Sequence, residues 1–106
     1  MRFTRTASGR LQLNVTDDPD YDVARRIAAA ILKTFSGRRG KSLMDIAGSA
    51  YLDVVIAGVT VTIHVHRLSG ICVFAVDEAA DGVILDVANY LKANGDKLGI
   101  ETIRTV

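Results

Sequence analysis

Two histidines lie one residue apart in the segment VTIHVHRLSG, residues 61–70, and the chain has no other histidine. In an extended strand alternate residues point to the same face, so His64 and His66 would present two imidazoles side by side. Imidazole binds transition metals and transfers protons near neutral pH. Both activities need further groups, because a metal ion requires at least one more ligand and covalent catalysis requires a nucleophile beside its base.

The strand before His64 can supply such groups if the two strands form a hairpin. Ala57 and Gly58, between two runs rich in β-branched residues, predict a two-residue loop. The resulting register places three apolar pairs on one face: Ile56–Val59, Val54–Val61 and Leu52–Ile63. It places three more polar pairs on the other face: Val55–Thr60, Asp53–Thr62 and Tyr51–His64. We expect the apolar pairs to face the helices, since a shift by one residue would bury the polar set.

Three interpretations of the polar face remain open. His64, His66 and Asp53 could form a two-histidine, one-carboxylate metal site, since Asp53 is the only carboxylate that the hairpin places nearby. Either histidine could act as a general acid or base, although no serine or cysteine nucleophile is expected beside it. The favoured interpretation is that both are polar side chains on an open sheet face. We therefore expect no catalytic residue, no bound metal and no cofactor.

Four aspartates occur in the segment TDDPDYD, residues 16–22, at the start of an expected helix. Asp18 is a suitable N-cap, and Pro19 fits the first helical position, where a missing N–H costs nothing. The aspartates that follow would favour the positive end of the helix dipole. Alternatively, the segment forms an acidic knob that binds a basic partner. This acidic knob consists of Asp17, Asp18, Asp20, Tyr21 and Asp22.

A second charged segment, SGRRGK at residues 36–41, combines glycines with three cations and could hold a phosphate. It lacks the strand–loop–helix setting and the spacing of a P-loop. We therefore expect Gly37 to end the first helix and residues 38–49 to form a solvated loop.

The remaining patterns complete the expected fold. Even spacing around Ser8–Gly9 predicts an N-terminal hairpin, and three strands are expected at residues 50–56, 59–66 and 71–77. A second helix is expected at residues 78–94, with Asp77 as its N-cap and Asn94–Gly95 as its end. The tail, residues 99–106, is expected to form a last strand or a loosely attached end. The predicted order is ββ-α-βββ-α-β, a single α+β domain over residues 1–106. It would be a two-layer sandwich, ferredoxin-like in character, with two helices on one face of an antiparallel sheet.

Composition limits the classes of partner. The chain has 106 residues, 49% of them hydrophobic and 24% charged, and a formal net charge of +1. This balance predicts neither a nucleic-acid binder nor a protein of anionic membrane surfaces. We expect a cytoplasmic protein, since there is no signal-peptide pattern or membrane span and the single cysteine, Cys72, is expected to be a buried, reduced thiol.

Residues 43–95 resemble the small α/β immunity proteins of bacterial contact-dependent growth inhibition and related polymorphic toxin systems. The resemblance is carried by the Ser49-x-Tyr51-x-Asp53 strand, the turn at Gly58, the TIHVH strand, and the SGICVF strand before the final helix. It implies a non-enzymatic cytoplasmic protein that binds the C-terminal toxin domain of a cognate toxin, often a nuclease, and blocks its active site. Many immunity proteins against nucleases are acidic, whereas this chain is near neutral.

The resemblance and the residues together leave two candidate surfaces for a toxin. One is the acidic knob, which suits a basic nuclease. The other is the sheet face with Tyr51, Asp53, His64 and His66. Two other functions stay open: a small metal-dependent or acid–base enzyme built on His64, His66 and Asp53, and a ferredoxin-like ligand-binding or dimerisation module. The oligomeric state is not specified by any of these patterns.

Overall fold

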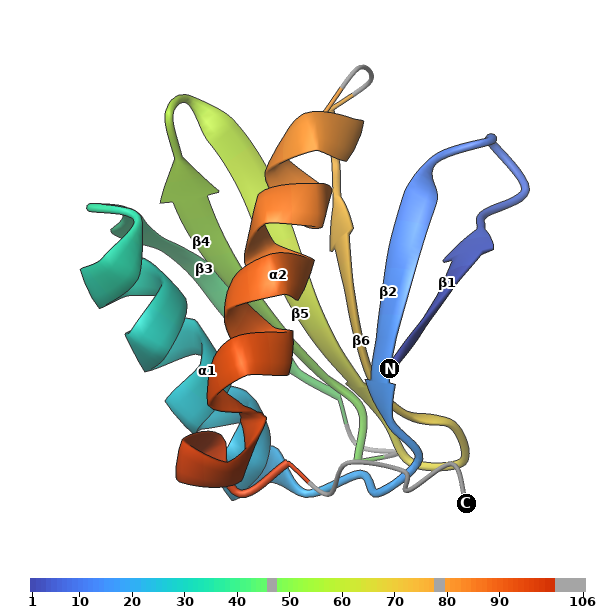
Figure 1. Cartoon of the computed structure of the whole chain (residues 1–106). Coiled ribbons are helices and arrows are strands. Elements are labelled where there is room, and N and C mark those ends of the chain that lie inside the picture. Colours follow the sequence, from blue (N-terminus) through green and yellow to red (C-terminus); the bar gives the residue numbers. More distant parts are fainter. Residues whose placement is uncertain (46–47, 78–79, 101–106) are drawn as a thin grey trace.

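The computed structural model describes residues 1–45, 48–77 and 80–100 (Figure 1). Its elements, in chain order, are β1 (Arg2–Arg5), β2 (Leu11–Thr16), α1 (Tyr21–Thr34), β3 (Arg38–Met44), β4 (Ala50–Ile56), β5 (Val59–His66), β6 (Gly70–Ala75) and α2 (Asp81–Leu98). The strands form one sheet in the order β1-β2-β6-β5-β4-β3, and every neighbouring pair is antiparallel. Both helices lie on one face of this sheet (Figure 1). The expected α+β fold with two helices on one side of an antiparallel sheet is confirmed.

The hairpin of β4 and β5 has the register expected from its loop. Ala57 and Gly58 have φ angles of 50° and 79°, as a two-residue loop of type I′ requires. All six predicted pairs are present, from Ile56–Val59 to Tyr51–His64. The five apolar residues predicted to face the helices belong to the buried core and are at most 7% exposed: Leu52, Val54, Ile56, Val61 and Ile63. The predicted division of this hairpin into an apolar and a polar face is confirmed.

Helix α1 begins and ends at different residues from those expected. Asp20, rather than Asp18, is its N-cap, and one carboxylate oxygen of Asp20 accepts the backbone N–H groups of Asp22 and Val23. The left-handed residue after the helix is Ser36, with φ 52°, rather than Gly37. Gly37 is needed for a different reason, because a Cβ there would lie 2.9 Å from the carbonyl oxygen of Val55.

Residues 38–44 form edge strand β3, where a loop was expected. They pair with β4, and the register shifts between Arg39 and Ser42 at a bulge. Every residue of β3 is exposed, so the segment lacks the alternation of apolar and polar residues that identifies a half-buried strand. Its charged residues are typical of an edge strand that discourages pairing with other chains.

Helix α2 also differs from its prediction at both ends. Its N-cap is Ala80, without a capping side chain, whereas Asp77 accepts the backbone N–H of Thr60 at 3.3 Å. At the other end Gly95 is buried within the helix, and Gly99 closes it with φ 77°. The helix therefore passes through the Asn94–Gly95 pair that was expected to end it.

The observed order of elements is ββ-α-ββββ-α, so the predicted ββ-α-βββ-α-β order is wrong. Four consecutive strands separate the helices, and this departs from the ferredoxin-like character expected. Ile100, which belongs to the expected tail strand, is not part of a strand. It is 3% exposed and packs in the core. Residues 101–106, where the rest of the expected last strand falls, lie outside the described residues.

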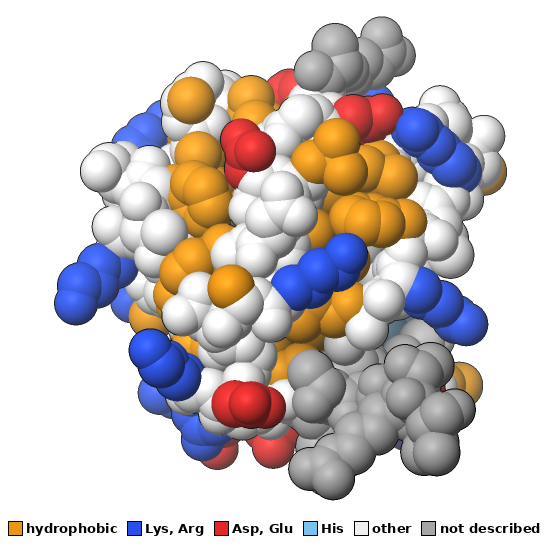
Figure 2. Space-filling model, in the orientation of Figure 1, with side chains coloured by type: hydrophobic (Ala, Val, Ile, Leu, Met, Phe, Trp, Pro, Cys, Tyr) orange, Lys and Arg blue, Asp and Glu red, His pale blue; other side chains and the backbone are white. Residues whose placement is uncertain are grey.

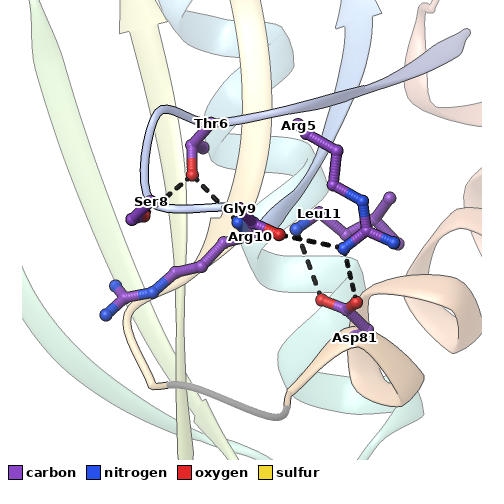
Figure 3. A network of polar contacts seen from close by, with 7 residues as sticks. All are labelled: Arg5, Thr6, Ser8, Gly9, Arg10, Leu11 and Asp81. Carbon is purple, nitrogen blue, oxygen red and sulfur yellow. Dashed lines mark hydrogen bonds and ion pairs between the residues drawn. The ribbon is translucent and has the colours of Figure 1, made fainter.

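A polar network joins the N-terminal hairpin to the start of α2 (Figure 3). The Arg5 guanidinium donates to a carboxylate oxygen of Asp81 at 2.7 Å and to the Gly9 carbonyl at 3.1 Å. The other Asp81 oxygen accepts the backbone N–H of Leu11 at 3.3 Å. These hydrogen bonds lower the pKa of Asp81, and the one from Arg5 has the largest effect.

Neither described helix has the length and apolar character needed to cross a membrane.

Candidate functional site

The sheet face opposite the helices carries a cluster of rings. Tyr51 of β4 and His64 of β5 are cross-strand partners, and their rings stack with centroids 4.2 Å apart and planes 8° from parallel. Phe74 of β6 meets His64 edge-on at 6.4 Å. Because residues of adjacent strands contribute one ring each, the cluster runs across the middle of the sheet. We call these three residues the ring cluster.

A hollow of about 590 Å³ lies beside the ring cluster, toward the β3 edge. Its lining is Lys41, Ser42, Leu43, Tyr51, Asp53, Thr62 and Phe74. Leu43 is 64% exposed, so this part of the face presents an apolar side chain to solvent. Asp53 accepts a 2.7 Å hydrogen bond from the hydroxyl of Thr62, its cross-strand partner, which is 4% exposed. The hollow therefore combines apolar surface with a fixed carboxylate.

Cys72 lies beside His64, contrary to the sequence-based expectation that no nucleophile would. The register of β5 and β6 makes the two residues cross-strand partners, and Sγ of Cys72 lies 3.8 Å from Nδ1 of His64. Cys72 is only partly buried and lies on the open face with His64, so the buried thiol that was expected is found only in part. The sequence could have predicted this contact, because a β5–β6 hairpin that pairs His66 with Gly70 also pairs His64 with Cys72.

The environment of this pair keeps both groups neutral. Burial raises the pKa of the Cys72 thiol to about 11. Burial also lowers the pKa of His64, and repulsion from His66 adds to this effect while Asp45 opposes it. A reactive cysteine requires a thiolate, stabilised by a cation such as a protonated histidine. Burial thus disfavours both the thiolate of Cys72 and the imidazolium of His64, the two charged forms that such a reactive pair uses.

The two histidines lie together, but Asp53 does not join them. The rings of His64 and His66 are 5.7 Å apart and nearly perpendicular. Nδ1 of His66 accepts the backbone N–H of Leu68 at 3.1 Å, while Nε2 of His64 is buried and has no hydrogen-bond partner. Within residues 1–45, 48–77 and 80–100, no three His, Cys, Asp or Glu side chains are grouped closely enough to hold a metal ion. The two-histidine, one-carboxylate arrangement is not assembled there.

The acidic knob is partly occupied by local structure. Asp20 caps α1, and Asp22 lies 4.0 Å from Arg25, with both of these side chains well exposed. Tyr21 is partly buried and packs against the core, so it is a poor candidate for a protruding anchor. Asp17 and Asp18 are exposed to solvent. Only part of the knob's charge is therefore available to a partner.

The knob borders one end of the open sheet face. A Cβ added at Gly70 would collide with the carbonyl oxygen of Thr16 and lie 2.6 Å from the backbone of Asp17. Gly70 is the cross-strand partner of His66. The β5–β6 turn thus packs against the segment that begins the knob, and one partner could cover both candidate surfaces.

Comparisons of the chain with protein-family models, with curated proteins and with solved structures find no significant match.

Proposed function

We propose that this protein is a non-enzymatic immunity protein that binds and neutralises the toxin domain of a contact-dependent growth inhibition system. Its open sheet face is the binding surface. The observation that carries this proposal is the ring cluster beside a hollow of about 590 Å³ on a face that no described helix covers. The immunity role itself comes from the sequence resemblance.

Binding is better supported than catalysis by the chemistry of the same face. The thiol of Cys72 has a pKa of about 11, and the pKa of His64 is lowered, so neither supplies a charged reactive group at neutral pH. Asp53 is engaged by the Thr62 hydroxyl at 2.7 Å. These contacts fix the side chains of the open face before binding, which lowers the entropic cost of binding a partner.

The ring cluster is a better centre for the interface than the acidic knob. Binding energy in protein interfaces concentrates in a few central residues, with aromatic side chains among the commonest. Tyr51 stands beside the exposed Leu43 on the open face, whereas Tyr21 of the knob packs against the core. The exposed aspartates at the border would contribute mainly to the rate and specificity of association.

The test first looks for a gene of a large secreted toxin directly upstream of this chain's gene, and then expresses the C-terminal domain of that toxin. Co-expression of the two should restore growth, and the purified proteins should form a stable complex. The double variant Tyr51→Ala/Leu43→Ala should weaken binding by about thirtyfold or more, since truncating a central residue typically costs about 2 kcal/mol. Leu85→Ala is the matched control, because Leu85 is 46% exposed but lies on α2.

Two results would contradict different parts of the proposal. Failure of the wild-type protein to bind or neutralise the toxin domain would reject the immunity function. Binding by the wild type with less than threefold loss in the Tyr51→Ala/Leu43→Ala variant would reject the open face as its site. Parallel substitution of Asp17, Asp18 and Asp22 by asparagine would then test the knob.

A further inference from the structure

A second cleft, of about 350 Å³, lies on the helix side of the sheet between α1 and β3. It exists because β3 extends the sheet beyond the helix layer: α1 packs mainly against β4 and β5. In the β3–β4 register Arg39 and Ser42 are partners of Val54 and Leu52, whose side chains face the helices. Arg39 and Ser42 therefore form the outer wall of the cleft, and the flank of α1 forms the inner wall.

Three arginines and two aspartates, Asp22 and Asp53, line this cleft, so the charge of its lining is positive overall. Arg25 and Arg26 contribute from α1, and Arg39 contributes from β3. Among the described residues Arg39 has no hydrogen bond or ion pair, and Arg25 approaches only Asp22, at 4.0 Å. Arg26 donates one long hydrogen bond, 3.4 Å, to the Leu98 carbonyl. Figure 2 shows several Lys and Arg side chains along the α1 side of the molecule.

The floor of the cleft is apolar. It is formed by Leu52 and Val54 of β4 together with Ala28 and Leu32 of α1. A ligand that uses both features must therefore carry negative charge and apolar side chains. Arginine pairs with carboxylates through two parallel hydrogen bonds, which fixes their orientation as well as attracting them.

The neighbouring edge strand suits an extended ligand. All of β3 is exposed, and among the described strands it is an edge strand with a neighbour, β4, on one side only. At its end Leu43 and Met44 are 64% and 60% exposed. An extended peptide beside β3 would present alternate side chains to the cleft and to the opposite face.

We propose that this cleft binds an extended acidic protein segment in which every second residue faces the cleft, and these cleft-facing residues are carboxylates and apolar side chains in turn. The carboxylates pair with Arg25 and Arg39, displacing Asp22 from Arg25, and the apolar side chains pack on Leu52 and Leu32. The segment is distinct from the partner of the open sheet face, because it binds on the other side of the sheet. Inorganic phosphate would use the arginines alone and leave the apolar floor uncovered.

The test measures fluorescence anisotropy of a short labelled peptide with the repeat Glu-Ser-Val-Ser, here called the Glu–Val peptide, which places Glu and Val on the same face of an extended chain. A peptide with the repeat Lys-Ser-Val-Ser, the Lys–Val peptide, is the control probe. The wild-type protein should bind the Glu–Val peptide saturably, and added salt should weaken the complex. The variant Arg25→Glu/Arg39→Glu should lose at least about tenfold in affinity, because it reverses both contacts. Arg2→Glu/Arg67→Glu makes the same change in net charge away from the cleft and should retain binding. If the double variant does not fold, the single variant Arg39→Ala replaces it in the test, and it should show a smaller loss of affinity.

Four results would overturn the inference. They are no saturable binding of the Glu–Val peptide, equal binding of the Lys–Val peptide, unchanged affinity in the cleft variants, and equal loss in the Arg2→Glu/Arg67→Glu control. Displacement of the peptide by inorganic phosphate at a similar concentration would instead identify a simple anion site. None of these results depends on whether the toxin domain binds the open face.

Discussion

At the scale of single residues, the open face is defined by groups that burial holds in their neutral forms. His64 stacks on Tyr51 at 4.2 Å and touches Cys72, so one side chain from each neighbouring strand limits access of water to its ring. Desolvation disfavours the charged form of both an imidazole and a thiol, but it moves their pKa values in opposite directions. The effect of burial can therefore be measured on Cys72 and on His64 separately.

Cys72 should react slowly with thiol reagents in the folded protein. Its pKa of about 11, against 9.0 for an unperturbed thiol, lowers the thiolate fraction at pH 8 by about a hundredfold, and the thiolate is the reacting species. Modification by iodoacetamide should accelerate by at least about thirtyfold when the protein is unfolded in urea. Equal rates in the folded and unfolded protein would show that Cys72 is freely ionised, and would reopen the catalytic interpretation of its contact with His64.

His64 should make the folded protein less stable as the pH falls below about 6.5. Its pKa is lowered in the folded state, so in the interval between the two pKa values the unfolded chain binds the extra proton, and the free energy of unfolding rises with pH. Urea unfolding at pH 7.5 and 5.5 should show a larger loss of stability in the wild type than in His64→Gln. His66→Gln should reduce the difference in part, because His66 is the second cause of the shift.

At the scale of elements, the two strands of the β4–β5 hairpin were predicted residue for residue, whereas other boundaries were not. Ala57–Gly58 and the alternation of its flanking strands are local signals, and the loop geometry fixes both register and faces. Strand β3 has no such signal, since all its residues are exposed and its identity as a strand comes from pairing with β4. The Cys72–His64 contact was missed for a related reason, because it depends on the register of a second hairpin.

Helix ends were predicted poorly because several residues nearby could serve as caps. Asp18 and Asp20 are equally suitable N-caps by type, and in the structure Asp20 caps the helix. At the end of α2, Gly95 and Gly99 are in the same way both suitable by type to end the helix. Gly99 adopts the left-handed conformation, while Gly95 is buried against Ile100. Helix position was readable from periodicity, and helix boundaries were not.

Gly70 is the glycine on which the packing of neighbouring elements depends most. It has φ 91°, and a Cβ there would meet the backbone of Thr16 and Asp17. Gly70→Ala should lower the free energy of unfolding by about 3 kcal/mol or more, since backbone strain and a backbone collision act together. Gly9→Ala is the matched control: Gly9 has φ 83°, but no atom lies within 4 Å of an added Cβ. Its cost should be about 1–2 kcal/mol. Equal losses in urea unfolding would show that the close approach of the two segments is wrong.

At the scale of the whole molecule, both helices pack against one continuous hydrophobic core. The buried residues of β2, β4, β5 and β6 form a single core cluster with those of α1 and α2. Strand β5 lies within this sheet between β6 and β4, and its hydrophobic residues pack under the helices while its histidines face the other way. The recognition surface is thus the reverse side of the strands that build the core, so its shape depends on the stability of the entire sheet.

Ile63 provides the test of that dependence, because it is 0% exposed and is followed directly by His64 in β5. Ile63→Ala should lower the free energy of unfolding by about 3 kcal/mol, through lost burial and the cavity left in the core. With a typical total of 5–15 kcal/mol, the variant should remain folded at 25 °C but unfold at markedly lower urea concentration. With Tyr21 and Tyr90 also replaced by phenylalanine, Tyr51 is the only tyrosine of the chain. Far-ultraviolet circular dichroism and tyrosine fluorescence of this variant should then report one shared transition, since Tyr51 lies on the reverse side of the same sheet. Loss of the tyrosine signal well before the secondary structure would mean that the ring cluster melts independently, and that the open face is not held rigid by the core beneath it.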